Sequence, residues 1–252
     1  MRQVASDPRV VCIIEARFAS TRLPGKVLMP ILGEPMLARM IERLSRSRTV
    51  DSIVVATSTS HADDAVAEAA ADAGAECFRG SEDDVLGRVV GAARAYDADV
   101  IAETTGDCPL HDAAILDKVV SDFLFGGANF VGNIHPYTTP RGTDVRVFSA
   151  EDLAEIERTS ADPADREHVS LYFWEHPEKY RLRNVTSDLP HEAAALRLTV
   201  DTQADLDMVT AIYEELYPGN PEFSLADVLS LIERRPELAE INAQVQQKPV
   251  RQ

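Results

Sequence analysis

The stretch VVCIIEARFASTRLPGK, residues 10–26, joins a run of apolar residues to a short segment that carries several cations. The apolar run at its start is typical of a strand that is covered on both faces of a sheet. Arg17, Arg22 and Lys26 then follow, and a Pro-Gly pair just before Lys26 favours a tight turn. Such a turn would bring Arg22 and Lys26 back over the carboxyl end of the strand.

Cations that converge on one loop repel each other unless an anion joins them, and a polyphosphate is well suited to that place. The spacing alone leaves a second interpretation open, in which the loop is solvated and its cations pair with surface carboxylates. The loop has neither the GxxxxGK[ST] pattern of a Walker A motif nor the GxGxxG pattern of a dinucleotide-binding turn. It therefore predicts a different kind of phosphate site.

Outward from this stretch, short apolar runs alternate with segments of helical periodicity. This alternation predicts an α/β fold, a three-layer Rossmann-like mixed sheet with helices on both faces. After Asn129 the order changes, and two strands flank the loop 134–143, which indicates a small antiparallel insertion. We expect one domain over residues 1–252, with a subdomain at about 134–195. The predicted strands are 10–15, 52–57, 76–79, 100–105, 129–133, 144–148, 180–185 and 195–200.

Two carboxylates follow predicted strands. Asp107 lies in TTGDCPL (residues 104–110), and Asp201 lies in RLTVDTQADL (residues 197–206). Ligands of open α/β sheets bind at the carboxyl ends of the strands, and two carboxylates there can hold a magnesium ion that also binds substrate phosphates. The alternatives are that Asp107 only forms a turn and that Asp201 only precedes a helix capped by Thr202.

Composition excludes several classes of protein. The net charge of −17 argues against nonspecific binding to nucleic acid or to an anionic membrane, although a local cationic pocket can still bind a small anion. Cys12, Cys77 and Cys108 are odd in number and form no CxxC motif, which argues against a disulfide framework or a zinc site. Without a signal-like or membrane-spanning run, we expect a cytoplasmic protein.

Several motifs, in this order, together resemble the cytidylyltransferase family of bacterial surface-sugar biosynthesis: ARFASTRLPGK, FRGSEDDVLGR, TTGDCPL, YTTPRGTDVRVF, REHVS and RLTVDTQADL. The spore-coat polysaccharide branch is the most similar, and the enzymes that make CMP-3-deoxy-manno-octulosonate and CMP-sialic acid are more distant. The resemblance covers about residues 10–217, and no motif was found after Pro218. It implies a GT-A-type nucleotidyltransferase fold, a homodimer and dependence on Mg²⁺. The subdomain at about 134–195 would bind the acceptor or form the dimer, and its Phe173 and Trp174 either face a second subunit or pack on the sheet.

The resemblance also implies roles for individual residues. Lys26, Arg22 and Arg17 would hold the triphosphate as catalytic residues, and Asp107 and Asp201 would bind the metal. The loop 79–84 would lie beside the nucleobase and ribose, whereas the segments 140–144 and 166–170 would approach the acceptor. The substrate-binding residues implied in this way are Ala16, Arg79, Ser81, Asp83, Thr105, Gly106, Arg141, Asp144, Arg166 and His168.

The implied reaction transfers a nucleoside monophosphate, CMP from CTP, to a sugar or sugar acid and releases pyrophosphate, in surface polysaccharide or glycoconjugate biosynthesis. Glu15 departs from the branch, which usually has Gln there, so base preference stays open, and a guanylyltransferase of the same fold is an alternative. A non-catalytic nucleotide-binding protein is another. A GT-A-type glycosyltransferase is a third, but it needs a DxD-like motif at a strand end, and the acidic pairs at 97–99 and 205–207 are poorly placed for that role.

Overall fold

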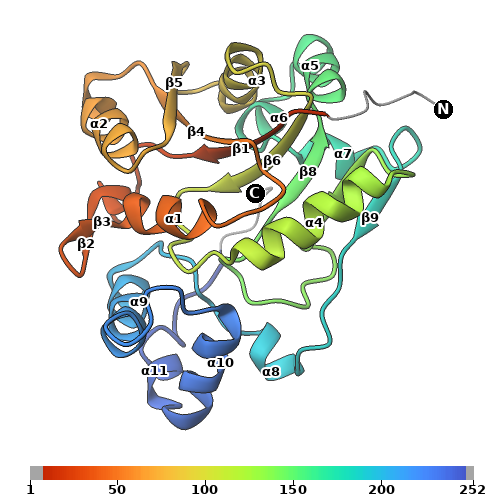
Figure 1. The fold of residues 1–252 in the computed structure, drawn as a ribbon. Coiled ribbons are helices and arrows are strands. Elements are labelled where there is room, and N and C mark those ends of the chain that lie inside the picture. Colours follow the sequence, from red (N-terminus) through yellow and green to blue (C-terminus); the bar gives the residue numbers. More distant parts are fainter. Residues whose placement is uncertain (1–7, 248–252) are drawn as a thin grey trace.

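In the computed structural model, which describes residues 8–247, seven strands form one mixed sheet (Figure 1). From one edge to the other they are β5 (Glu76–Gly80), β4 (Ser52–Ser58), β1 (Val10–Glu15), β6 (Val100–Thr105), β8 (Arg146–Ser149), β7 (Phe130–Gly132) and β9 (Leu182–Asn184). A separate antiparallel ribbon joins β2 (Pro30–Ile31) to β3 (Glu34–Pro35).

The sheet has a parallel half and a half with reversed strands. Strands β5, β4, β1 and β6 pair in parallel, as the alternation of strands and helices predicts. Strand β8 then runs antiparallel to both β6 and β7, and β7 pairs in parallel with β9. The predicted α/β fold with an antiparallel insertion is therefore confirmed.

Helices cover both faces of the sheet. Alternate residues of β1 point to opposite faces, so they pack in two separate cores. Cys12 and Ile14 pack in a core with α1 (Met36–Leu44), α2 (Asp64–Asp72) and α4 (Ala113–Phe125). Val11 and Ile13 pack in a second core. The helices on that side are α3 (Val85–Ala95), α5 (Ala150–Thr159) and α7 (Leu171–Glu175), which follows the short α6 (Pro163–Glu167).

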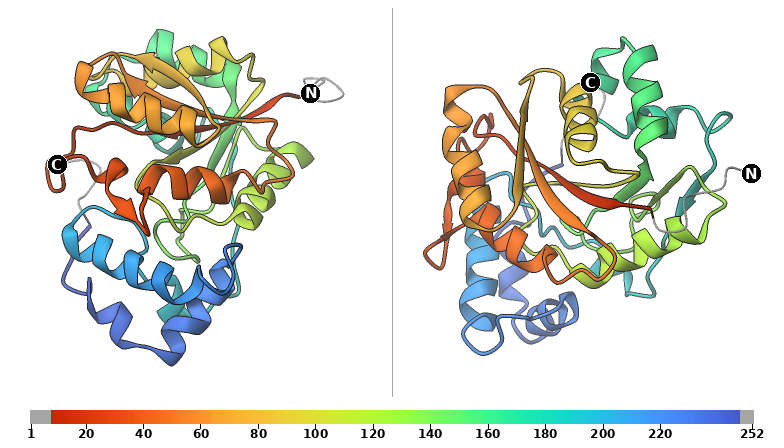
Figure 2. Two further views of the ribbon diagram at one scale, coloured as in Figure 1. Left: turned by 60° about the vertical axis from the view of Figure 1, so that its left-hand side comes forward. Right: turned by 45° about the horizontal axis from the view of Figure 1, so that its top comes forward.

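The C-terminal helices lie together at one end of the molecule, against α1 (Figure 2). They are α9 (Gln203–Leu216), α10 (Leu225–Arg234) and α11 (Glu237–Glu240), after the short α8 (His191–Ala194). The guanidinium of Arg39 on α1 stacks on Tyr217, and that of Arg43 stacks on Phe223. Thr202 and Ser224 begin α9 and α10 with capping boxes, as their spacing from a following aspartate predicts.

One strand prediction is wrong. Residues 195–200 form no strand, and only Arg197 makes an isolated bridge, to Arg141. The backbone of this segment bonds to loops instead. Leu198 N–H donates to the carbonyl of Arg141 at 2.7 Å, and Val200 N–H donates to that of Asp107 at 2.8 Å. The segment 195–200 therefore links the loop that contains Arg141 to the loop that contains Asp107.

The segment 134–195 contains β8, which lies inside the main sheet between β6 and β7. Phe173 on α7 is fully buried, and its ring stacks on that of Phe148 of β8 with 5.1 Å between the ring centroids. Phe173 therefore packs on the sheet. Trp174 lies edge-on to Phe130 at 5.0 Å. An acceptor-binding or dimerisation role for the segment stays a prediction.

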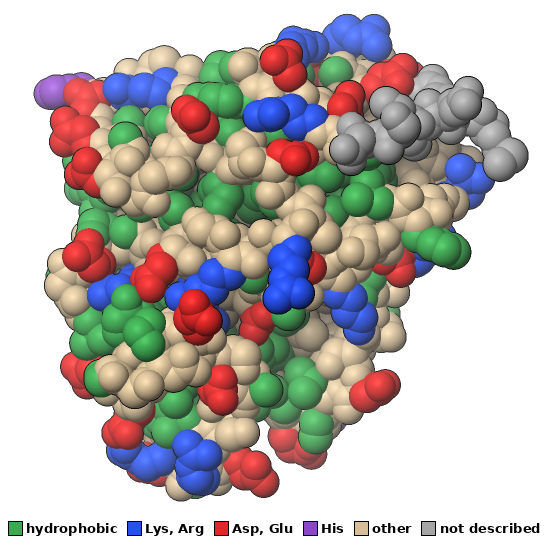
Figure 3. Space-filling view, viewed as in Figure 1, with side chains coloured by type: hydrophobic (Ala, Val, Ile, Leu, Met, Phe, Trp, Pro, Cys, Tyr) green, Lys and Arg blue, Asp and Glu red, His purple; other side chains and the backbone are tan. Residues whose placement is uncertain are grey.

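Acidic and basic side chains are interspersed on the face shown in Figure 3, and neither sign forms a continuous field there. Within residues 8–247, none of the helices has the length and apolar character that crossing a membrane requires.

Candidate active site

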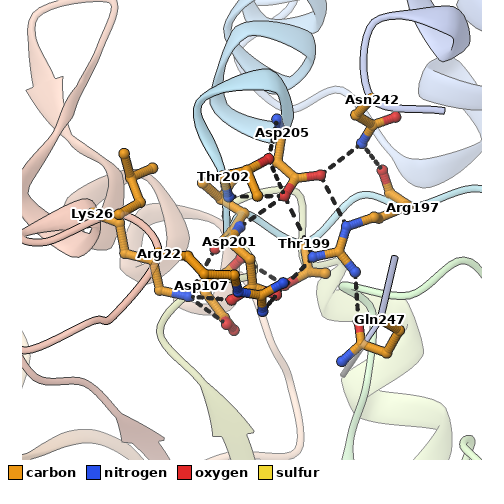
Figure 4. Close-up of polar contacts among 12 residues, drawn as sticks. Arg22, Lys26, Asp107, Arg197, Thr199, Asp201, Thr202, Asp205, Asn242 and Gln247 are labelled. Atoms are coloured by element: carbon orange, nitrogen blue, oxygen red, sulfur yellow. Dashed lines mark hydrogen bonds and ion pairs between the residues drawn. The ribbon is translucent and has the colours of Figure 1, made fainter. Parts of the chain in front are cut away.

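Lys26 joins two carboxylates that come from distant parts of the chain (Figure 4). Its Nζ donates to Oδ2 of Asp107 at 2.9 Å and to Oδ1 of Asp201 at 2.8 Å. It also donates to the carbonyl of Val200 at 2.8 Å. The structure thus brings the cationic loop after β1 to both of the predicted metal ligands, at the carboxyl end of the sheet.

Gly25 allows the loop to turn back in this way. Its φ is 70°, in the left-handed region that favours glycine. A Cβ at this position would lie 2.8 Å from the ring of Phe18, and the Gly25 N–H donates to the Phe18 carbonyl at 2.9 Å. The Pro-Gly turn predicted from the sequence therefore starts η1 (Lys26–Leu28) with Lys26 aimed at the carboxylates.

Asp201 also accepts contacts from two guanidinium groups. Its Oδ2 lies 2.7 Å from an Nη of Arg22 and 2.6 Å from an Nη of Arg197. Arg197 reaches further, because its Nε donates to Oδ1 of Asp205 at 2.9 Å. The sequence predicts Arg22 as a phosphate ligand, whereas it indicates no role for Arg197 beyond its place in the RLTVDTQADL motif.

Electrostatics keep this cluster charged. Burial would raise the pKa of Asp201, but Lys26, Arg197 and Arg22 outweigh it and lower that pKa to about 2. Burial would likewise raise the pKa of Asp107, and Lys26 again makes the net shift downward. The pKa of Lys26 is raised, since the two carboxylates outweigh the effect of its own burial.

The loops that carry the cluster are held against each other at close range. Gly106 N–H donates to the carbonyl of Glu15 at 2.8 Å, and a Cβ on Gly106 would lie 2.9 Å from that of Ala16. Thr105 Oγ1 donates to Oδ1 of Asp107 at 2.6 Å and orients that carboxylate. Ala16, Thr105 and Gly106 therefore shape the site, and direct contact between them and a substrate stays a prediction.

Arg17 points to the loop that follows β5. Its Nη1 donates to the carbonyl of Glu82 at 3.4 Å. Ser81 and Asp83 in that loop are exposed, as a ligand-binding role requires. Arg79 is engaged elsewhere, because its Nε donates to the carbonyl of Ser58 at 2.9 Å and holds β5 against the end of β4.

The REHVS motif meets the same loop. Arg166 on α6 contacts Asp84 at 3.2 Å and donates to the carbonyl of Glu157 at 2.7 Å. Asp84 in turn caps α3 by accepting from Gly87 N–H at 2.9 Å. His168, half-buried, lies at the end of α6. The structure therefore brings Arg166 close to the predicted base-binding loop, although the resemblance implies that it approaches the acceptor.

The predicted acceptor loop lies against the segment that leads to Asp201. The guanidinium of Arg141 stacks 4.0 Å above the ring of Tyr137, whose hydroxyl donates to Asp144 at 3.0 Å. Gly142 has a φ of 99°, and a Cβ there would lie 2.6 Å from the backbone of Leu198. Arg141 and Asp144 are thus brought to the catalytic end of the sheet.

A second charged cluster lies on the α3 side of the sheet. Arg146 of β8 contacts Glu103 of β6 at 3.2 Å and Asp144 at 3.7 Å. Burial raises the pKa of Glu15 well above its usual range, and the charge of Glu103 and a hydrogen bond with it act in the same direction; Arg146 and Arg88 oppose them only in part. The Glu15 carboxyl is therefore protonated over a wider range of pH than an exposed glutamate.

The donors at the catalytic end fit a hard divalent cation that shares its ligands with a substrate. Mg²⁺ is commonly bound by one or two carboxylates together with waters and substrate phosphates, and Asp107 and Asp201 supply such a pair. Among residues 8–247, no group of three or more His, Cys, Asp or Glu side chains is assembled for a metal. A metal held here would need further oxygen ligands from the substrate or from water.

Comparisons with known proteins place the chain in a family. The cytidylyltransferase family model matches residues 11–235, which extends the resemblance past Pro218 into α10. The spore coat polysaccharide biosynthesis protein SpsF of Bacillus subtilis is 33% identical, over 91% of this chain and 96% of its own. The 3-deoxy-manno-octulosonate cytidylyltransferase of Geobacter sulfurreducens is 31% identical, over 74% of this chain and 69% of its own.

The solved structures agree with the sequence comparisons. A cytidylyltransferase from Leptospira borgpetersenii superposes with a TM-score of 0.87 at 33% identity, covering 96% of this chain and 99% of its own. Together with the family match, this confirms the resemblance that the motifs predict. The chain belongs to the cytidylyltransferase family and is a nucleotidyltransferase.

Proposed function

We propose that this protein transfers CMP from CTP to a sugar or sugar acid, with Mg²⁺ as cofactor and pyrophosphate as the second product. The observation that carries the proposal is the convergence of Lys26 and Arg22 on the carboxylates of Asp107 and Asp201. The named activity of the 3-deoxy-manno-octulosonate relatives supports a sugar acid as acceptor, and the similarity to SpsF supports polysaccharide biosynthesis. A homodimer in the cytoplasm remains our expectation.

In this reaction an acceptor oxygen attacks the α-phosphorus of the nucleotide, and the bond to the pyrophosphate oxygen breaks. Lys26 and Arg22 would stabilise the negative charge that develops on the phosphate oxygens, which is the main task in phosphoryl-type transfer. Asp107 and Asp201 would hold the magnesium ion, which when bound neutralises phosphate charge and favours ionisation of the acceptor hydroxyl. Arg17 and the loop 81–84 would contact the nucleoside.

The acceptor would enter beside the loop 137–144. Arg141, stacked on Tyr137, offers a cation there, and Asp144 offers a hydrogen-bond acceptor for hydroxyl groups. A cation next to a polyol-binding carboxylate suits an acceptor that is both anionic and hydroxylated. This is the reason that we favour a sugar acid over a neutral sugar.

The positions of the DxD-like pairs disfavour the glycosyltransferase alternative. Asp99 lies before β6, at the amino end of the sheet, where it accepts from the N–H of Arg9 at 2.8 Å. Asp205 and Asp207 lie within α9, and Asp205 is fully buried. Neither pair lies at the carboxyl end of a strand, where such an enzyme would hold a nucleotide sugar.

The test is pyrophosphate release with each of the four nucleoside triphosphates, magnesium, and a panel of neutral sugars and sugar acids. We expect release with CTP and a sugar acid, and its loss in Asp107→Asn. Release with GTP instead would move the assignment to a guanylyltransferase. If no nucleotide gives release and none raises the thermal midpoint in the presence of magnesium, the proposal is wrong.

A further inference from the structure

Arg197 connects Asp201, the proposed metal ligand, to the segment that follows α11. One Nη donates to Oδ2 of Asp201 at 2.6 Å, while Nε donates to Oδ1 of Asp205 at 2.9 Å. Only 9% of the Arg197 side chain is exposed, so the planar guanidinium is held in one orientation by these carboxylates. The side chain of Asp201 is therefore fixed from the side opposite to Lys26 (Figure 4).

Asp205 fixes the backbone of the same residue. Its Oδ2 accepts from the N–H of Asp201 at 2.9 Å and from that of Thr202 at 3.0 Å, while the fully buried side chain also belongs to the capping box of α9. Arg197 and Asp205 thus hold the side chain and the main chain of Asp201 together. The pair lies within eight residues, on the two sides of the carboxylate that it supports.

The segment after α11 closes this arrangement. Asn242 Nδ2 donates to Oδ1 of Asp205 at 2.9 Å and to the carbonyl of Arg197 at 3.0 Å. Asn242 is only 5% exposed, so these bonds are protected from water. The side-chain oxygen of Gln247 accepts from the remaining Nη of Arg197. We name Arg197, Asp205, Asn242 and Gln247 the Asp201 brace.

We propose that Arg197 is a positioning residue that orients Asp201 for metal and nucleotide binding, and that the C-terminal segment acts on the site through Asn242. The inference rests on the proposed function and assigns a role to the segment after Pro218. Groups that orient a metal ligand commonly change metal affinity about 10–100-fold when they are removed. A brace of this kind predicts that contacts far along the chain control the binding of the metal.

The conservative substitution separates positioning from charge. Arg197→Lys keeps the positive charge beside Asp201, but an ammonium cannot reproduce a fork that spans Asp201 and Asp205. Asn242→Ala removes the contact from the C-terminal segment and leaves every charge unchanged. The control is Arg183→Lys, because Arg183 makes an ion pair of the same length, 2.6 Å, with Asp122 between β9 and α4, with 35% of its side chain exposed.

The experiment measures Mn²⁺ binding by electron paramagnetic resonance, with the full chain and a non-hydrolysable α,β-methylene analogue of CTP. We expect Arg197→Lys and Asn242→Ala to weaken Mn²⁺ binding about tenfold, with Arg183→Lys unchanged. Thermal unfolding of the same samples identifies any variant that fails to fold. If Arg197→Lys does not fold, Mn²⁺ binding by Asn242→Ala tests the proposal.

Three outcomes overturn the proposal. The brace is wrong if both variants bind Mn²⁺ as the wild type does, or if Arg183→Lys loses the same affinity. If the wild type binds neither Mn²⁺ nor the analogue, the proposed function fails first and the brace fails with it. The wild-type titration therefore separates failure of the function from failure of the brace.

Discussion

Two charged clusters lie near the carboxyl ends of β1 and β6, and they shift the pKa values of their carboxyl groups in opposite directions. In the first, Lys26 contacts both Asp107 and Asp201, and the pKa of Asp201 is lowered to about 2. In the second, the pKa of Glu15 is raised well above its usual range, beside Glu103. Both clusters are partly or fully removed from water, so burial alone does not explain the difference.

The difference follows from the direct partners of each carboxylate. Asp201 has the cations of Lys26 and Arg22 within 2.8 Å, and these outweigh the cost of burial. Glu15 has another carboxyl as a close neighbour, and its Oε1 is buried without a hydrogen-bond partner among residues 8–247. The charges of the first cluster suit the binding of cations and phosphates, whereas the second cluster favours the protonated form of the Glu15 carboxyl group.

Removing Lys26 gives the largest effect we expect, because it takes away the cation that the first cluster shares. Lys26→Met should lower the turnover number about 10²–10³-fold, as does the loss of a group that stabilises charge in a transition state. The measurement is pyrophosphate release at saturating CTP and magnesium. Lys179→Met, which changes an exposed lysine beside Tyr172, is the control and should retain full activity. A fall of less than threefold in Lys26→Met would contradict our assignment.

Removing Glu103 tests the second cluster through stability. Glu103→Ala leaves the mostly buried Arg146 with only the longer contact to Asp144, and breaking a buried ion pair in this way costs about 3 kcal/mol. Urea unfolding at neutral pH measures the loss. Glu237→Ala removes an exposed partner of Arg235 and should leave the unfolding midpoint unchanged. Equal midpoints for both variants would show that the pair in the second cluster contributes nothing.

Much of the fold follows from local patterns in the sequence. The bounds of β1 and β6 were predicted to the residue, because each is a continuous apolar run that ends in polar residues. The segment 195–200, ALRLTV, alternates apolar and polar residues as a half-buried strand does, but it bonds to the loops at Arg141 and Asp107 instead of joining the sheet. A local pattern alone does not reveal which segment finds a partner in the sheet.

The site was predictable where a residue follows a predicted strand and obscure where no such signal exists. Lys26, Arg22, Asp107 and Asp201 were predicted from their places after strands, although Lys26 and its partners lie 81 and 175 residues apart. Arg146 lies inside a predicted strand and Asn242 lies outside every motif, so neither position indicates a role. Nothing in the sequence around His111 indicates that it is fully buried, with its Nε2 3.2 Å from the carbonyl of Asp144.

Gly106→Ala probes the contact between the loops that carry the first cluster. The added Cβ would lie 2.9 Å from that of Ala16 and 3.2 Å from the carbonyl of Glu15, so the loops after β1 and β6 must separate slightly. A shift of a few tenths of an ångström between Lys26 and Asp107 should lower kcat/KM about tenfold. Gly74→Ala is a control for general destabilisation, because the helix end at Gly74 has open space for a Cβ but a φ of +80° that strains an alanine. Unchanged kcat/KM in Gly106→Ala would show that the spacing of these loops is not critical.

The smallest effect at neutral pH should come from Glu15→Gln, which puts an uncharged amide of the same shape in place of a carboxyl group whose pKa is raised well above its usual range. Since the folded protein retains the Glu15 proton where an unfolded chain has released it, the folded state binds more protons. The contribution of Glu15 to stability is therefore complete below its unfolded pKa of about 4.3 and is lost as pH rises through the raised pKa. The variant has no proton to lose at this position.

The measurement is the free energy of unfolding in urea, for wild type and variant, at several pH values between about 5 and 9. This range begins above the pKa of an unfolded glutamate and ends near that of a free cysteine. We expect the variant to gain on the wild type steadily as pH rises, with activity at neutral pH within about twofold. Parallel curves would mean that Glu15 is ionised in the folded state and pairs with Arg88 or Arg146. In that case the two clusters would hold their carboxylates in the same state, and Glu15 would carry a fixed negative charge at the end of β1.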